Sequence, residues 1–215
     1  MLMNLINKYF LFFILCVIPA LSNAQQAMKP MADTAAFKNG LAQFSGSTQT
    51  IQGEFIQEKK LKMLNDKVVS KGSMYFKKEN KLRWEYTEPF SYIISLNNGK
   101  VMLKDEGKVT GYDANANKLF LELNDILITC INGNIFQSKK FSFRFFESEK
   151  NNIAEMTPVN SAMKNFIDKI VLFFDKTDFT VTKVDMLEPS QNSTVIIFKN
   201  KKLNGDIHDN YFILN

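Results

Sequence analysis

The chain has 215 residues, a formal net charge of +5, two cysteines and one histidine. This length is enough for one sizeable hydrophobic core. The single histidine argues against a histidine-based metal site, and the basic residues form no stripe of the kind that binds nucleic acid. The modest positive charge suits either an anionic membrane or acidic partner, or a lysine-rich surface that serves solubility.

Residues 1–24 have the pattern of a secretory signal peptide. Lys8 precedes an apolar run over residues 10–21, and small residues ending at Ala24 form a cleavage site. We therefore predict export and cleavage after Ala24, with residues 25–215 forming a single domain. An uncleaved membrane anchor is the alternative, although the apolar run is short for a transmembrane helix.

The two cysteines predict neither a lipid anchor nor an internal disulfide. Cys16 follows Leu15 inside the apolar run, whereas a lipidated cysteine needs a small residue before it. Cleavage leaves Cys130 as the only cysteine of the exported chain, so it has no partner within the chain. We interpret Cys130 as a small buried hydrophobic side chain.

Beyond the signal peptide, one short helix precedes a long series of strand patterns. The helix is expected over residues 34–44, where Asp33 can cap its N-terminus. Segments of alternating polarity bounded by turns then predict strands, and Asn98-Gly99 is a strong hairpin signal. The expected strands span residues 51–62, 69–78, 82–86, 92–96, 100–104, 109–113, 118–122, 140–147, 153–157, 166–175, 179–187, 194–199 and 210–214.

A second helix is expected over residues 124–132. Asn124 can cap it, apolar residues from Ile126 to Ile131 recur at helical spacing, and Gly133 can end it. Short helices among so many strands predict a mostly β protein, in which a large antiparallel sheet curls into a sandwich or a barrel.

No constellation of catalytic residues is recognisable. His208 lies in a polar tail, no serine lies in a nucleophile elbow, and no glycine-rich loop could cradle a phosphate. Carboxylates are plentiful, so a two-carboxylate glycosidase is an alternative, but no motif supports it. We predict no catalytic residue, no metal and no cofactor.

The chain contains 20 phenylalanines and 10 methionines. Flat phenylalanine and flexible methionine side chains suit a surface that adapts to lipid-like ligands. The same side chains also fill ordinary cores, so composition alone leaves both interpretations open.

The most informative segment, residues 72–99, reads GSMYFKKENKLRWEYTEPFSYIISLNNG. The residues that carry a recognisable pattern in it are Gly72, Lys77, Asn80, Arg83, Trp84, Tyr86, Pro89 and Gly99. Upstream, Gly53-Glu54-Phe55-Ile56-Gln57 reads as a Gly-x-Phe-x-Gln strand. Together these motifs resemble the outer-membrane lipoprotein carrier family of the LolA type. The motifs match over residues 53–99, and the order of elements is similar from about residue 34 to the C-terminus.

The chain departs from the family pattern in two places and is similar to a divergent member. Lys78 and Glu79 stand where the family has arginine and proline in a turn. Lysine keeps the charge of that arginine, which the resemblance links to lid closure, but loses its planar hydrogen-bonding fork. Lys104-Asp105 stands where a Tyr-Asp pair often occurs.

The resemblance implies an unclosed antiparallel β half-barrel with a lid of short α-helices over an apolar cavity. It also implies a monomeric periplasmic chaperone that shuttles lipoproteins from the inner to the outer membrane. The implied partners are acylated lipoproteins, an inner-membrane lipoprotein-releasing ABC transporter, and either an outer-membrane receptor or the outer membrane itself, without nucleic acid. A regulatory module that senses lipids or lipoproteins on the same fold is the alternative.

The resemblance further implies which residues contact acyl chains. These are Phe55, Met74, Phe76, Leu82, Trp84, Tyr86, Leu127 and Ile131. Lys78 and Arg83 are assigned to the lid and turn. Each apolar residue in this set is equally compatible with a place in a plain hydrophobic core.

Overall fold

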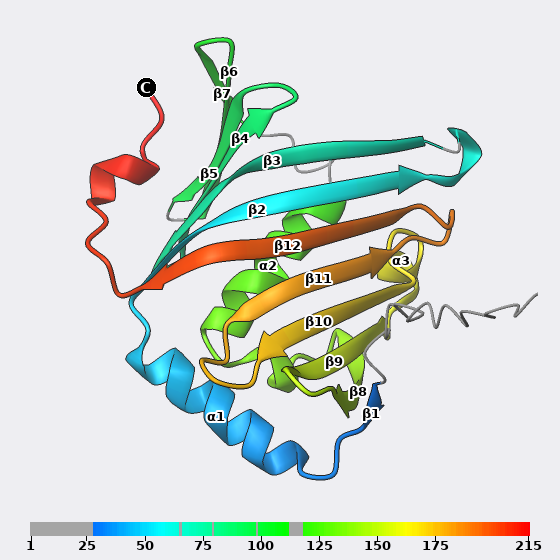
Figure 1. The fold of residues 1–215 in the computed structure, drawn as a ribbon. Coiled ribbons are helices and arrows are strands. Elements are labelled where there is room, and N and C mark those ends of the chain that lie inside the picture. Colours follow the sequence, from blue (N-terminus) through cyan, green and yellow to red (C-terminus); the bar gives the residue numbers. More distant parts are fainter. Residues whose placement is uncertain (1–27, 65, 79, 98, 112–117) are drawn as a thin grey trace, which may run out of the picture.

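A computed structural model describes residues 28–64, 66–78, 80–97, 99–111 and 118–215. These residues form a mostly β fold, in which a 12-stranded sheet carries a few short helices (Figure 1). The signal peptide expected over residues 1–24 lies outside the described residues, and so does its cleavage site. No helix in the described part of the chain is long and apolar enough to cross a membrane.

The strands are β1 (Lys29–Pro30), β2 (Thr50–Leu61), β3 (Asp66–Lys77), β4 (Lys81–Glu88), β5 (Tyr92–Asn97), β6 (Lys100–Asp105), β7 (Lys108–Gly111), β8 (Phe141–Glu147), β9 (Asn151–Pro158), β10 (Lys169–Asp175), β11 (Val181–Leu187) and β12 (Ser193–Leu203). The α-helices are α1 (Thr34–Ser47), α2 (Lys118–Ile131) and α3 (Ser161–Lys164). The single-turn 3₁₀ helices are η1 (Lys62–Leu64), η2 (Ile135–Gln137) and η3 (Asp209–Phe212).

The sheet is antiparallel and open. Its strand order is β1-β8-β9-β10-β11-β12-β2-β3-β4-β5-β6-β7, and each neighbouring pair is antiparallel. Because β1 and β7 stand at the two edges and do not pair with each other, the sheet does not close into a barrel. This architecture confirms the mostly β, unclosed antiparallel fold with short helices.

The centre of the sheet brings the two ends of the chain together. β12 pairs with β2 over Ser193↔Lys60 to Leu203↔Ile51, so residues 133 to 152 positions apart in the sequence become neighbours. β2 and β3 form a long hairpin, and β4 to β7 extend the sheet by further hairpins. The β5–β6 hairpin contains Gly99 at φ 76°, as the Asn-Gly signal predicts.

The alternation expected for β3 and β4 is confirmed. Met74 pairs with Trp84 and Phe76 pairs with Leu82, and all four side chains are buried on one face of the sheet. Gly72 is required where these strands cross closely, since a Cβ atom there would lie 2.1 Å from the carbonyl oxygen of Glu85.

The helices cover the inner face of the curled sheet. In Figure 1, α2 runs behind the strands and α1 packs at one end of them. Asp33 caps α1 as expected, because its carboxylate accepts a hydrogen bond of 2.9 Å from the backbone N–H of Ala36. Apolar residues of α1, α2 and the strands join in one hydrophobic core, in which Phe37 packs edge-to-face on Phe174.

Some expected elements are wrong. Residues 118–122, expected as a strand, begin α2, because their pattern also fits a helix and the apolar residues of α2 pack in the core with the sheet. Asn124 is consequently not a cap and lies inside α2. The expected strand over residues 210–214 overlaps η3, and the expectation missed β1 and α3. Residues 112–113 of another expected strand lie outside the described residues.

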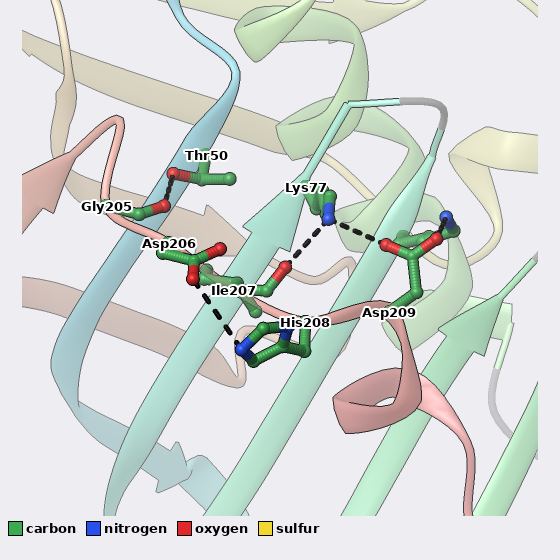
Figure 2. A network of polar contacts seen from close by, with 8 residues as sticks. Thr50, Lys77, Gly205, Asp206, Ile207, His208 and Asp209 are labelled. Atoms are coloured by element: carbon green, nitrogen blue, oxygen red, sulfur yellow. Dashed lines mark hydrogen bonds and ion pairs between the residues drawn. The ribbon is translucent and has the colours of Figure 1, made fainter.

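The C-terminal segment crosses the outer face of β2 to β5 (Figure 2). The Thr50 hydroxyl donates to the carbonyl of Gly205 at 2.6 Å. The Lys77 ammonium donates to the carbonyl of Ile207 and pairs with Asp209, each at 2.7 Å. Ile207 is buried, so this segment covers the sheet on the side opposite to the helices.

Candidate functional site

A small cavity, here called the inner cavity, lies between the helices and the sheet. Its volume is about 30 Å³, which is room for a few water molecules at most. Helices α1 and α2 form its roof, and β2, β3, β4, β10, β11 and β12 contribute to its floor and walls. The lining residues are Leu41, Phe44, Ile51, Met74, Leu82, Leu127, Cys130, Ile131, Phe174, Phe179, Thr180, Val181, Phe198 and Lys201.

A larger hollow, here called the side groove, lies between α2 and strands β4 to β6. Its volume is about 290 Å³. The lining residues are Asn80, Leu82, Trp84, Ile94, Leu96, Gly99, Val101, Leu121, Asn124, Asp125 and Ile128. Leu82 lines both hollows, so its side chain is part of the wall that separates them.

The structure divides the apolar residues that the sequence assigned to acyl-chain contact. Met74, Leu82, Leu127 and Ile131 line the inner cavity, and Trp84 lines the side groove. Phe55, Phe76 and Tyr86 are buried but line neither hollow. The ring of Phe55 packs edge-to-face on the rings of Trp84 and Tyr86, at centroid distances of 4.8 and 4.9 Å. These three side chains lie in the packed core beneath the hollows.

Sequence reasoning missed the contributions of α1 and β5 to the hollows. Leu41 and Phe44 lie on the buried face of α1, and Ile94 and Leu96 alternate in β5. The sequence indicates an apolar face for each element, but it does not indicate which helix faces which strand across the core. Lys201 gave no sequence signal, since alternation alone would direct it to solvent.

One polar contact joins the sheet to α2 at the floor of the side groove. The indole N–H of Trp84 donates to Asn124 Oδ1 at 2.5 Å, and both residues are buried. A buried polar group is costly without a partner, so this bond favours one position of α2 over the sheet.

Comparison with known proteins places this fold in a family. The family model described as outer membrane lipoprotein carrier protein LolA matches residues 46–215. The chain belongs to the LolA family. A search of curated protein sequences found no match.

Solved structures with a similar fold include members of the LolA superfamily and the protein MucB. A crystal structure of MucB has a TM-score of 0.53 and 14% identity, over 86% of this chain and 64% of that one. The Pseudomonas aeruginosa MucA/MucB complex has a TM-score of 0.50 and 11% identity, over 84% of this chain and 60% of that one. A LolA superfamily protein from Nitrosomonas europaea has a TM-score of 0.45 and 10% identity, over 83% and 96%.

Identities this low show a shared fold and nothing finer. The chain spans about 60% of the length of the MucB chains in the complexes that it matches. The family assignment therefore depends on the LolA model, which covers most of the chain.

In this LolA-family member, the β3–β4 turn contacts the ends of both long helices. The Lys78 ammonium donates to the backbone carbonyls of Ser45 at 2.7 Å and Gly46 at 3.4 Å, in the last turn of α1. Carbonyls at a helix C-terminus lack partners within the helix and carry partial negative charge, so a cation is favourable there. Asn132, just after α2, donates to Asn80 Oδ1 at 3.2 Å.

Arg83 has a different environment from the one that the sequence suggested. Its guanidinium donates to the carbonyl of Tyr211 at 2.8 Å and to Glu85 at 3.2 Å, and it stacks over the Tyr211 ring. These partners lie on the outer face of the sheet and in the C-terminal segment. Arg83 therefore holds that segment in place, and the contacts to the helices come from Lys78 and Asn80.

The lining of the two hollows is mostly apolar. Burial raises the pKa of the Cys130 thiol, so it stays protonated in the cavity wall. Within the described ranges, no cluster of three or more histidine, cysteine, aspartate or glutamate side chains could hold a metal ion. This lining can shield an apolar ligand from water. Shielding of this kind needs apolar side chains and no reactive groups.

Proposed function

We propose that this protein carries the acyl chains of lipoproteins across the periplasm, with the chains held between α2 and the sheet. The observation that carries this proposal is the mostly apolar side groove, which meets the inner cavity at Leu82 in a LolA-family fold. An acyl chain in water costs about 0.8 kcal/mol per exposed CH₂ group. A multiply acylated protein therefore needs a carrier to cross an aqueous compartment.

Binding requires the helices to move. The inner cavity, at about 30 Å³, has no room for an acyl chain. An incoming chain would replace the contacts that Leu127 and Ile131 of α2 make with the sheet, so apolar surface would be exchanged for apolar surface. Such an exchange changes the free energy little, which allows both loading and release.

In the cell, the protein would act between the two membranes. Residues 1–24 would be removed as a signal peptide, and residues 25–215 would act as a monomeric single domain in the periplasm. An inner-membrane lipoprotein-releasing ABC transporter would load the carrier, and an outer-membrane receptor or the outer membrane itself would receive the cargo. The process needs no cofactor and no bond-making step.

Binding can be measured through Trp84, which is the only tryptophan of the chain and lines the side groove. Titration with a triacylated lipopeptide should change its fluorescence, and the same peptide without acyl chains should not. The test variant is Val101→Glu, because Val101 lines the groove on β6. Its carboxylate would be desolvated by bound acyl chains, so the affinity should fall at least about tenfold.

The matched control is Val68→Glu, at a half-exposed valine of β3 that pairs with Lys59 away from both hollows. This variant should bind like the wild type, and circular dichroism should show that both variants are folded. Equal binding by Val101→Glu would overturn the groove as the lipid site. A response to the peptide without acyl chains would instead favour the regulatory module that senses a partner segment.

A further inference from the structure

Lys201 brings a cation into an otherwise apolar cavity. Apart from Lys201 and Thr180, each residue that lines the inner cavity is apolar. Lys201 is half-buried. It lies at the α1 end of the cavity, because it bonds Thr180 and because Phe179, the residue before Thr180, packs against Gly40 of α1.

A β-bulge turns Lys201 inward. Up to Phe198, even-numbered residues of β12 are buried and odd-numbered ones are more exposed, so alternation would direct Lys201 outward. The register changes between Lys199↔Glu54 and Lys202↔Gln52, which leaves Asn200 and Lys201 both opposite Gly53. Bulges re-aim side chains in this way and are common beside functional sites.

The residues around the bulge stabilise this arrangement. Asn200 has φ 50°, and its side-chain amide donates to Glu54 at 2.8 Å. Gly53 leaves space for the Lys201 side chain, because a Cβ atom at this glycine would lie 3.4 Å from Lys201 Cγ and 3.1 Å from the Lys199 carbonyl oxygen.

The Lys201 charge is only partly compensated. Its ammonium donates a hydrogen bond to the Thr180 hydroxyl, and that hydroxyl donates to Asp178 Oδ1 at 2.5 Å. Among the described residues, Lys201 makes no direct ion pair. Burial lowers the pKa of Lys201, and the more distant charges of Asp178 and Asp175 oppose this effect. A partly desolvated cation without a direct counter-ion is a favourable place for a ligand anion.

The turn beside Lys201 has an unusual backbone. Phe179 has φ 56°, which is uncommon for a bulky side chain. Its ring packs against α1 so closely that a Cβ atom at Gly40 would lie 2.2 Å from it. This turn places the Phe179 ring in the wall of the inner cavity and the Thr180 hydroxyl next to the Lys201 ammonium.

We propose that the inner cavity, once it is widened by the helix movement described above, takes an acyl chain that ends in an anionic head group, a carboxylate or a phosphate, with Lys201 as its counter-ion. This inference rests on the proposed carrier function and names a ligand class for the same site. The head group would lie at Lys201 and Thr180, and the chain would run past Met74 and Leu82 toward the side groove. A lipid of this kind could occupy the carrier in place of lipoprotein acyl chains.

The experiment measures the affinities of palmitate, hexadecyl phosphate, uncharged methyl palmitate and a triacylated lipopeptide by calorimetry. The test variant is Lys201→Met, which keeps a flexible unbranched side chain of nearly the same length and removes its charge. Lys202→Met is the matched control, because Lys202 is the next residue, is exposed and has the same charge. In Lys201→Met, the affinity for the two anions should fall about tenfold or more, as expected for loss of a charged hydrogen bond.

Methyl palmitate and the lipopeptide should bind Lys201→Met as they bind the wild type, and the control should bind all four ligands normally. A loss for only one anion would support the proposal and identify the head group. Unchanged affinity for both anions in Lys201→Met, or an equal loss in Lys202→Met, would overturn it. If the wild type binds the lipopeptide but neither anion, the inference fails and the carrier function stands. If none of the four ligands binds, both fail.

Discussion

Replacement of Lys78 by methionine tests whether the helices act as a lid. The Lys78 ammonium donates at 2.7 Å to the carbonyl of Ser45 and at 3.4 Å to that of Gly46, at the C-terminal end of α1. Methionine keeps an unbranched apolar side chain of nearly the same length and removes these donors. The backbone N–H of Lys78, which donates to the carbonyl of Gln49, is unaffected. The substitution therefore weakens the attachment of α1 to the β3–β4 turn without creating a cavity.

The size of the expected effect follows from the free energy of the Lys78–Ser45 hydrogen bond. A hydrogen bond from a charged donor contributes about 1.5–3 kcal/mol when it is well shielded. The Lys78 side chain is partly exposed, so we take about 1–2 kcal/mol, which changes an equilibrium constant by a factor of about 5 to 30. If acyl chains bind only the open form, loss of this stabilisation raises the open population, and the lipopeptide affinity should rise by the same factor.

Two measurements check this expectation. Hydrogen exchange reports the opening of the last turn of α1, and the amides there should exchange about 5 to 30 times faster in Lys78→Met. Fluorescence titration of Trp84 with a triacylated lipopeptide reports the affinity. Lys77→Met is the matched control, since Lys77 binds Asp209 and Ile207 on the outer face and should leave both measurements unchanged.

The reasoning is refuted if Lys78→Met exchanges and binds like the wild type, because the turn would then not restrain α1. It is also refuted if α1 opens faster while the affinity falls, because the helices would then form part of the binding surface rather than a lid over it. Lys78→Arg should restore slow exchange, since arginine retains donors at this position.

Two further predictions concern stability. Phe76 is fully buried and lines neither hollow, so Phe76→Ala should cost about 3–5 kcal/mol in urea unfolding; a cost below about 1 kcal/mol would contradict its place in the core. Hydrogen bonds and charge from Lys77 and Lys81 lower the pKa of Asp209 from 3.8 to about 2. Because the folded-state pKa is depressed, this stabilisation is present above about pH 4 and disappears as the pH falls through about 2. Asp209→Asn should therefore lower the melting temperature at pH 6, and the difference from the wild type should shrink toward pH 2; a constant difference would refute the linkage.

Local sequence patterns determined much of the sheet. Alternation of apolar and polar residues predicted that Met74, Phe76, Leu82 and Trp84 share a buried face, because successive side chains of a strand point to opposite sides. Turn residues such as Gly99 marked the hairpins, because few residues adopt a positive φ without cost. The motifs that carry the family resemblance are also local, because residues 53–99 form the consecutive strands β2 to β5 and the turns between them.

Tertiary structure decided the features that depend on distant parts of the chain. Residues 118–122 have a pattern that fits a strand or a helix, and packing of α2 against the sheet selects the helix. Phe55, Phe76 and Tyr86 match the apolar pattern as well as Met74 does, yet only the meeting of two helices with the sheet decides which side chains border a hollow.

Lys201 shows the limit of sequence reasoning most clearly. Its direction depends on how β12 pairs with β2, which is about 150 residues away along the chain. A single extra residue in that pairing moves the side chains that follow to the opposite face of the sheet. No residue pattern within β12 predicts this bulge. Sequence patterns therefore predicted a large antiparallel sheet with an apolar face, and the family resemblance implied that this sheet is unclosed, whereas long-range pairing placed a cation in its cavity.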